Sequence, residues 1–277
     1  MRLILLITLL SFAIPAVAMP EKADFSVLPM SPRPPDYSTR GDLISLTNTS
    51  SAWIFSIQSG VKIVSAGYTL IEPNPMTIEP GPVFSVRVEG RDIPSNLWLV
   101  APVVDDSGSA LVRMRYSEGN LNLSARLWLV PLEDGRIKGR LRVANLSLLE
   151  KDFVVTFPYL PSISFDTART LISSGTQVSD QKPIEKAPET RIKVGKPTAV
   201  VVTAEPWSSA FYLYTHANGT EPEIQLRLTE SSASLAVEFS DNMKTLQSLD
   251  TGEVTLGLTK GDNMSVWSEL RDIGLLK

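Results

Sequence analysis

The sequence predicts an all-β fold, a large antiparallel β-sandwich (supersandwich) with a short C-terminal helix. Many short runs alternate apolar and polar residues, and a period of two places successive side chains on opposite faces of a strand. Turn-forming residues separate these runs at short intervals. None of the 277 residues is cysteine, so the fold depends on a hydrophobic core and not on disulfides. Many short strands of this kind indicate a sandwich and not an α/β fold.

The first 18 residues have the layout of a cleavable signal peptide. Arg2 supplies a positive charge, residues 3–13 contain an apolar run, and Ala16 and Ala18 precede the expected cleavage site. The apolar run falls short of the roughly 20 residues that a membrane-spanning helix needs, and no later segment reaches that length. We therefore expect a secreted or extracytoplasmic protein, in the periplasm or at the cell surface, with no membrane span after cleavage.

Two segments do not show the alternation of apolar and polar residues. Residues 19–40 are rich in proline and predict an extended leader, so that the sandwich domain occupies residues 41–277. Residues 173–198 are polar and contain three prolines, which predicts a long loop or an irregular crossing. In the alternative interpretation, this second segment links two smaller sandwiches.

The alternating runs predict which side chains enter the core. The expected core positions are Phe84, Val86, Val88, Ala110, Val112, Met114, Tyr116, Leu121, Leu123, Ala125, Leu127, Leu129, Gly139, Leu141, Val143, Ile224, Leu226, Leu228, Leu235, Val237, Phe239, Val254, Leu256 and Leu258. The opposite, solvent-facing positions include Arg113, Arg115, Arg126, Trp128, Lys138, Arg140 and Arg142. Residues 106–108, 118–120, 133–135 and 218–220 have the composition of hairpin turns. Near the end, Val266, Trp267, Leu270 and Ile273 recur at helical spacing, which predicts the short helix.

Composition and motifs argue against several classes of function. The net charge of −4, the pI of about 5.2 and the lack of any basic cluster along the chain argue against a nucleic-acid partner. His216 is the single histidine, so the acid–base machinery of an active mutarotase cannot be assembled. The sequence also lacks a Gly-x-Ser-x-Gly elbow, metal-ligand spacing and a glycine-rich phosphate loop. We therefore expect no catalytic residues, no metal and no cofactor, and binding or structural support in place of catalysis. An enzyme with an unrecognised site is the alternative, which a cluster of convergent carboxylates in a deep pocket would indicate.

One group of side chains has the character of a ligand site. If residues 210–216 form a strand, Tyr212, Tyr214 and His216 share one face of it. Aromatic rings can stack on a sugar, and their polar edges can hydrogen-bond its hydroxyls. Trp128, on the polar side of its run, is a further candidate. In the alternative interpretation, another layer of the protein covers these residues.

Five Asn-x-Ser/Thr triplets are possible glycosylation sites. They are Asn48, Asn122, Asn145, Asn218 and Asn263.

The order of several motifs resembles the galactose-mutarotase-like supersandwich found before the catalytic barrel in some glycoside hydrolase families. The motifs are Leu46-Thr47-Asn48, Trp53-Ile54-Phe55, Pro82-Val83-Phe84, Arg142-Val143-Ala144-Asn145, Phe157-Pro158-Tyr159-Leu160, Phe211-Tyr212-Leu213-Tyr214, and Gly261-Asp262-Asn263 with Trp267 and Arg271. The resemblance covers about residues 40–273. In those enzymes a barrel with the catalytic carboxylates follows, whereas this sequence stops at Lys277. The resemblance therefore implies a stand-alone accessory sandwich that contacts carbohydrate.

A second likeness covers residues 25–104 and fades afterwards. Phe25-Ser26-Val27-Leu28-Pro29, Ile44-Ser45-Leu46-Thr47-Asn48 and Val86-Arg87-Val88 resemble the first domain of periplasmic pilus-assembly chaperones. Those proteins consist of two immunoglobulin-like domains and donate a strand to a subunit. This likeness implies the alternative function, a periplasmic or cell-surface assembly or structural protein whose partner is another envelope protein.

Overall fold

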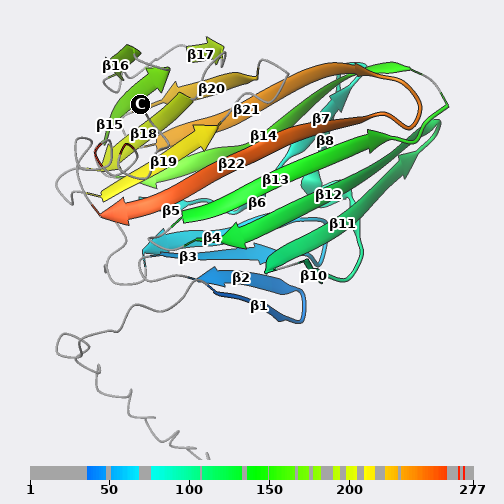
Figure 1. Cartoon of the computed structure of the whole chain (residues 1–277), viewed down its shortest axis with the longest axis horizontal. Coiled ribbons are helices and arrows are strands. Elements are labelled where there is room, and N and C mark those ends of the chain that lie inside the picture. The colour runs from blue at the N-terminus through cyan, green and yellow to red at the C-terminus, as the bar shows by residue number, and fades with distance from the viewer. Residues whose placement is uncertain are drawn as a thin grey trace, which may run out of the picture. The chain divides into compact units, whose positions relative to one another are not determined.

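The chain is an all-β protein, as the sequence predicts. The computed structural model describes residues 36–47, 51–68, 76–106, 108–132, 136–148, 150–165, 168–174, 177–181, 190–193, 198–204, 209–215, 222–229 and 232–260, together with Ser268 and Arg271. Their strands form three antiparallel sheets of five, ten and seven strands (Figure 1). Among these residues no helix is long and apolar enough to cross a membrane.

The five-stranded sheet contains the first strands of the chain, in the order β1-β2-β3-β4-β6. Its strands are β1 (Asp36–Arg40), β2 (Leu43–Thr47), β3 (Ser51–Ser56), β4 (Lys62–Tyr68) and β6 (Gly81–Pro82). Strand β1 pairs along its whole length with β2, so residues 36–40 of the segment for which the sequence predicts an extended leader belong to this sheet.

The ten-stranded sheet faces the viewer in Figure 1 and has the order β10-β11-β12-β13-β22-β19-β18-β15-β16, with β9 beside β11. Its strands are β9 (Leu99–Val100), β10 (Val104–Asp106), β11 (Ser109–Glu118), β12 (Leu121–Pro131), β13 (Arg136–Asn145), β15 (Ala168–Ser174), β16 (Gln177–Gln181), β18 (Thr198–Ala204), β19 (Ser209–Thr215) and β22 (Ser248–Lys260).

The seven-stranded sheet has the order β17-β20-β21-β14-β7-β8, with β5 beside β14. Its strands are β5 (Met76–Ile78), β7 (Ser85–Val88), β8 (Arg91–Pro94), β14 (Lys151–Phe165), β17 (Thr190–Lys193), β20 (Glu223–Leu228) and β21 (Ser232–Met243). A short 3-10 helix, η2 (Ser95–Leu97), follows β8. Strands from before residue 173 and strands from after residue 198 are neighbours in both large sheets.

A single cluster of buried apolar side chains joins the three sheets. The predicted alternation is confirmed, because the core positions expected on β7, β11, β12, β13, β21 and β22 are buried wherever their side chains are described, except for the half-buried Leu121. The two large sheets approach closely at Gly139, where a Cβ would lie 2.6 Å from Phe157 Cζ. Glycine is therefore needed on β13 so that the Phe157 ring of β14 can pack beneath it.

Several connections differ from the sequence-based expectations. The turns at 106–108, 118–120 and 133–135 do join paired strands, but the prediction of a hairpin at 218–220 is wrong. Strand β19 pairs with β18 and β22, whereas β20 pairs with β17 and β21, so this connection crosses between sheets. The segment 173–198, expected to be a loop, contains β16 and β17. Both are edge strands, which pair on one side only and need not bury an alternating apolar face.

The other terminal predictions lie outside the described residues. These are the signal peptide at 1–18 and most of the C-terminal helix, of which only Ser268 and Arg271 are described, both with helical backbone.

Candidate functional site

Trp128 lies on the outward face of the ten-stranded sheet, as its place among the polar positions of an alternating run predicts. Its neighbours Leu127 and Leu129 on β12 are buried in the core, whereas the Trp128 side chain is half-buried. Its indole Nε1 donates a 2.9 Å hydrogen bond to Asp106 Oδ2 on the edge strand β10. This bond fixes the ring across β11 and leaves it on the surface of the sheet.

Two ion pairs flank Trp128. Arg140, directly opposite on β13, has its guanidinium carbon 5.8 Å from the centre of the Trp128 ring, within range of a cation–π interaction. The same guanidinium donates to both carboxylate oxygens of Asp250, with Nε 2.9 Å from Oδ1 and Nη2 2.6 Å from Oδ2. Two residues along β13, Lys138 Nζ lies 2.9 Å from Glu253 Oε2.

A β-bulge brings both carboxylates to this face. The pairing of β13 with β22 skips between Arg142, which faces Asp250, and Arg140, which faces Glu253. One extra residue is accommodated there, and Gly252 adopts a φ of 67°, a left-handed conformation that suits glycine. Without the bulge, residues 250 and 253 would point to opposite faces of the strand.

The neighbours of Asp250 lower the pKa of its carboxyl group. Burial alone would raise the pKa of this carboxyl, but hydrogen bonds from Arg140 and from the Gly252 N–H, with the nearby charge of Arg142, bring the pKa below its ordinary value. The pKa of Arg140 is raised, chiefly by its hydrogen bond to Asp250. Both groups are therefore charged at neutral pH.

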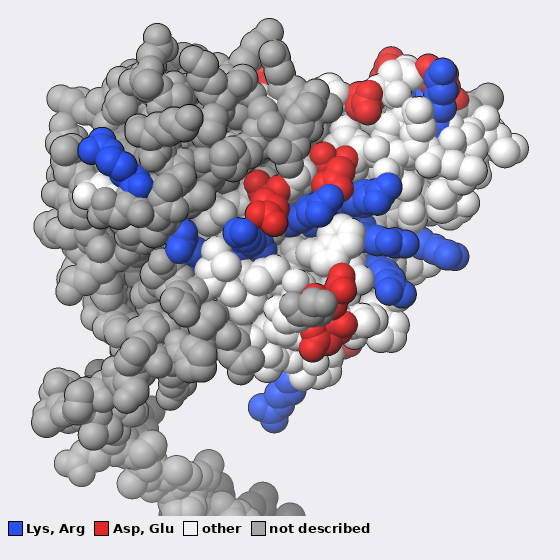
Figure 2. Space-filling model, viewed as in Figure 1, with Lys and Arg blue, Asp and Glu red and all other residues white. Residues whose placement is uncertain are grey.

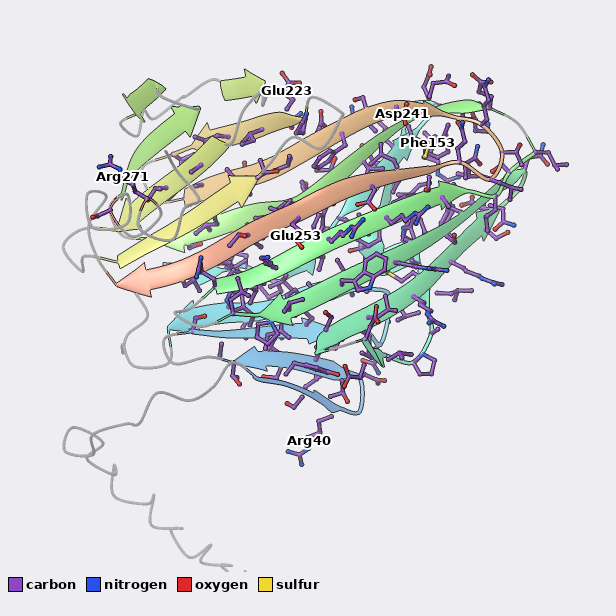
Figure 3. The ribbon with its side chains drawn as sticks, in the orientation of Figure 1. Arg40, Phe153, Glu223, Asp241, Glu253 and Arg271 are labelled. Carbon is purple, nitrogen blue, oxygen red and sulfur yellow. The ribbon has the colours of Figure 1, made fainter. Side chains whose placement is uncertain are left out.

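These side chains surround a shallow cavity of about 190 Å³. Its walls are Ser109, Trp128, Val130, Lys138, Arg140 and Glu253, and the backbone of Gly139 contributes to the lining. Glu253 lies on β22 near the centre of this face (Figure 3). An aromatic ring beside fixed donors and acceptors is the arrangement that binds the C–H face and the hydroxyls of a sugar.

The other predicted ligand residues lie elsewhere on the same sheet. Tyr212 and Tyr214 are on β19, opposite Gly257 and Thr255 of β22, and hence three strands away from Trp128. With a strand spacing of about 4.8 Å, the separation across the sheet alone is roughly 14 Å, and the register adds an offset along the strands. Ala199 and Val201, their partners on β18, are fully buried, so this part of the face is covered. The side chains of the two tyrosines and all of His216 lie outside the description, and a tyrosine site stays a prediction.

The predicted glycosylation sites fall in different environments. Asn122 is exposed at the start of β12. Asn145 is fully buried, and its amide Nδ2 donates to the Met243 carbonyl while its Oδ1 accepts from the Ser147 N–H. Asn145 thus holds the end of β13 in place in the folded chain. Asn48, Asn218 and Asn263 lie outside the described residues.

Strand pairing creates a cationic row that the sequence analysis did not predict. Arg113 on β11 lies opposite Arg126 on β12, and Arg126 lies opposite Arg142 on β13, so three arginines stand side by side across the sheet. Figure 2 shows basic side chains gathered over this part of the face. The expectation that the protein has no basic cluster is therefore wrong for its surface, because residues far apart in sequence meet through register. A signal was available, since all three are arginines at solvent-facing positions of adjacent alternating runs.

Comparisons with known proteins identify the fold. No known family model matches the chain, and no curated protein is detectably similar in sequence. The GH36 α-galactosidase AgaB from Geobacillus stearothermophilus matches with a TM-score of 0.56 at 10% identity, over 84% of this chain and 41% of the enzyme. Slr1438 from Synechocystis matches with a TM-score of 0.54 at 10% identity, over 84% of this chain and 99% of that protein. The α-N-acetylgalactosaminidase NagBb from Bifidobacterium bifidum matches with a TM-score of 0.55 at 12% identity, over 83% of this chain and 39% of the enzyme.

These likenesses confirm the predicted β-sandwich fold, which this chain shares with part of each of the two glycosidases and with Slr1438. The chain spans about two fifths of the length of the two glycosidases and nearly all of Slr1438. At such low identity the likeness shows the fold alone.

Proposed function

We propose that this protein is a secreted, non-catalytic β-sandwich that binds carbohydrate on the outward face of its ten-stranded sheet. The observation that carries the proposal is the Trp128 ring, held on the surface by Asp106 and bordered by the Arg140–Asp250 and Lys138–Glu253 pairs. A sugar ring stacked on the indole would find charged donors and acceptors at its edges.

The likeness in fold to two glycosidases and the signal-peptide pattern support this proposal. A non-catalytic role is supported by the site itself. Asp250 and Glu253 are each held by a cation, and the lowered pKa of Asp250 is the opposite of what a general acid at neutral pH requires.

The test is binding of the purified mature chain to a panel of soluble neutral and acidic polysaccharides, measured by calorimetry. We expect Trp128→Ala to weaken binding about tenfold or more, because the stacking surface is lost. Trp128→Phe keeps an aromatic ring but removes the Nε1–H bond to Asp106, so it should retain most of the affinity.

Leu246→Ala is a matched control, since Leu246 is 77% exposed and lies in the turn between β21 and β22, away from Trp128. Thermal melting of each variant separates loss of the site from loss of the fold. No binding to any polysaccharide, or equal binding by the wild type and a folded Trp128→Ala variant, contradicts the proposal.

A further inference from the structure

We propose that the arginine row beside Trp128 selects an acidic polysaccharide, one whose sugars carry carboxylate or sulfate groups. The row consists of Arg113, Arg126 and Arg142, with Arg115 next to it on β11. This inference rests on the proposed function and names the class of carbohydrate.

The row violates a rule of sheet stability. Residues directly opposite each other on one face of an antiparallel pair have Cβ atoms about 4.5–5.5 Å apart, and like charges at that distance repel. Here Arg126 has an arginine opposite it on both sides. An arrangement that weakens the free protein is typical of a binding site, where the ligand removes the penalty.

Three of the four arginines have no counter-ion in the described part of the protein, and the fourth, Arg142, lies opposite Asp250, which Arg140 already holds in a two-point contact. Arg113, Arg115 and Arg126 are exposed and make no ion pair with a described residue. Arg142 donates through Nε to Ser248 Oγ at 2.9 Å, which leaves its terminal nitrogens available. The nearest carboxylates on β22, Asp250 and Glu253, are held by Arg140 and Lys138. Arg113, Arg115 and Arg126 therefore present guanidinium groups that no carboxylate of the described residues compensates.

Room for a ligand exists along the row. A groove of about 530 Å³ is lined by Arg113, Arg115 and Arg126, with Leu99 and Leu146 among its other walls. Trp128 lies two residues from Arg126 on β12 and on the same face. An extended polymer crossing the strands could thus place one sugar ring on the indole and anionic groups on the row. Guanidinium groups bind carboxylate and sulfate through paired hydrogen bonds.

The net charge of −4 and the pI of about 5.2 oppose long-range attraction to any polyanion, so the row must act at short range. The proposed carbohydrate site around Trp128, on the same face, is what favours an acidic glycan over a nucleic acid.

The experiment measures binding of the mature chain to polygalacturonate, to the sulfated galactan carrageenan and to neutral galactan, at low and at high salt. The test variant is Arg113→Gln/Arg126→Gln/Arg142→Gln. The control, Arg40→Gln/Arg227→Gln/Lys244→Gln, removes the same charge from exposed positions outside the row, on β1, on β20 and in the turn after β21.

We expect the wild type to bind at least one acidic polymer more tightly than neutral galactan, with an affinity that falls as salt rises. The test variant should lose about tenfold or more of the affinity for the acidic polymer and none of that for galactan, while the control variant keeps both. A single-stranded DNA and vesicles containing an anionic lipid are further arms.

The inference is overturned if acidic and neutral polymers bind alike, if the test and control variants bind alike, or if DNA or vesicles bind more tightly than the polysaccharides. Carbohydrate binding that depends on Trp128 but not on the row would defeat this inference and leave the proposed function standing. Absence of binding to every polysaccharide would defeat both.

Discussion

Arg140 and Arg126 lie on neighbouring strands and on the same face of the same sheet, yet Arg140 has a carboxylate partner and Arg126 has arginines on both sides. Arg140 is stacked near Trp128 and bound at two points to Asp250. Arg126 stands between two other arginines and makes no ion pair with a described residue. The first arrangement contributes to the stability of the free protein, and the second reduces it.

The difference shows which part of the face is organised before any ligand arrives. Around Trp128 the protein supplies its own partners, through the bulge that presents Asp250 and Glu253 together. For Arg113 and Arg126 it supplies no counter-ion among the described residues, and Arg142 shares the charge of Asp250 with Arg140, so additional negative charge must come from outside for the row to be favourable. We therefore regard the Trp128 region as a preformed platform and the row as its selective extension.

The largest effect is expected beneath the platform, at Gly139. Gly139→Ala places a Cβ about 2.6 Å from Phe157 Cζ, and the buried Phe157 ring must move. We expect a loss of about 1–3 kcal/mol in the free energy of unfolding, measured by urea denaturation. A change near zero would show that the two sheets are packed more loosely here than the described contacts indicate.

Arg140→Gln tests the paired arginine. It removes the two-point contact with Asp250 and the cation beside Trp128, and leaves a half-buried carboxylate without its main partner. Because Arg140 is half-exposed, we expect a fall in Tm of only about 2–4 °C, corresponding to roughly 1 kcal/mol. An unchanged Tm would mean that the pair is no more stabilising than an ordinary surface salt bridge.

The stability supplied by Asp250 should depend on pH in a defined direction. Since the folded protein holds the pKa of Asp250 below its ordinary value of 3.8, the contribution is present above that pH and is lost as the pH falls through the lower, folded value. The gap in Tm between wild type and Asp250→Asn should be constant near neutrality and close only in strong acid. A gap that closes between pH 6 and about pH 5, well above the ordinary carboxyl range, would contradict this assignment.

The smallest effect has the opposite sign. Arg126→Gln removes the central charge of the row and with it two like-charge pairs, so we expect Tm to rise by roughly 1–2 °C at low salt. The increase should shrink when salt screens the row. A decrease in Tm at low salt would show that the row has a stabilising partner.

Much of the fold could be predicted because the core-facing residues of β11, β12, β13 and β21 follow a strict period of two. The prediction was wrong at residues 218–220, because the composition of a turn does not say which strands it joins. It also missed β16 and β17, edge strands whose pairing on one side needs no alternating apolar pattern.

The candidate site was predictable only in part. The outward position of Trp128 followed from its place in an alternating run. Its contacts with Asp106, 22 residues earlier, and with Arg140, on the next strand, could not be predicted in this way. Asp250 and Glu253 could not be placed on one face from the sequence, since their spacing of three residues points them apart unless a bulge intervenes.

The sequence by itself determined which side of each strand is apolar, because the burial of alternate side chains is a local property of an extended chain. It thereby determined that the arginines and Trp128 face outward. Only the tertiary structure decided which of them are neighbours, because adjacency across a sheet depends on strand order and register between segments distant in the chain. That is why a chain with a net negative charge can present a row of adjacent arginines.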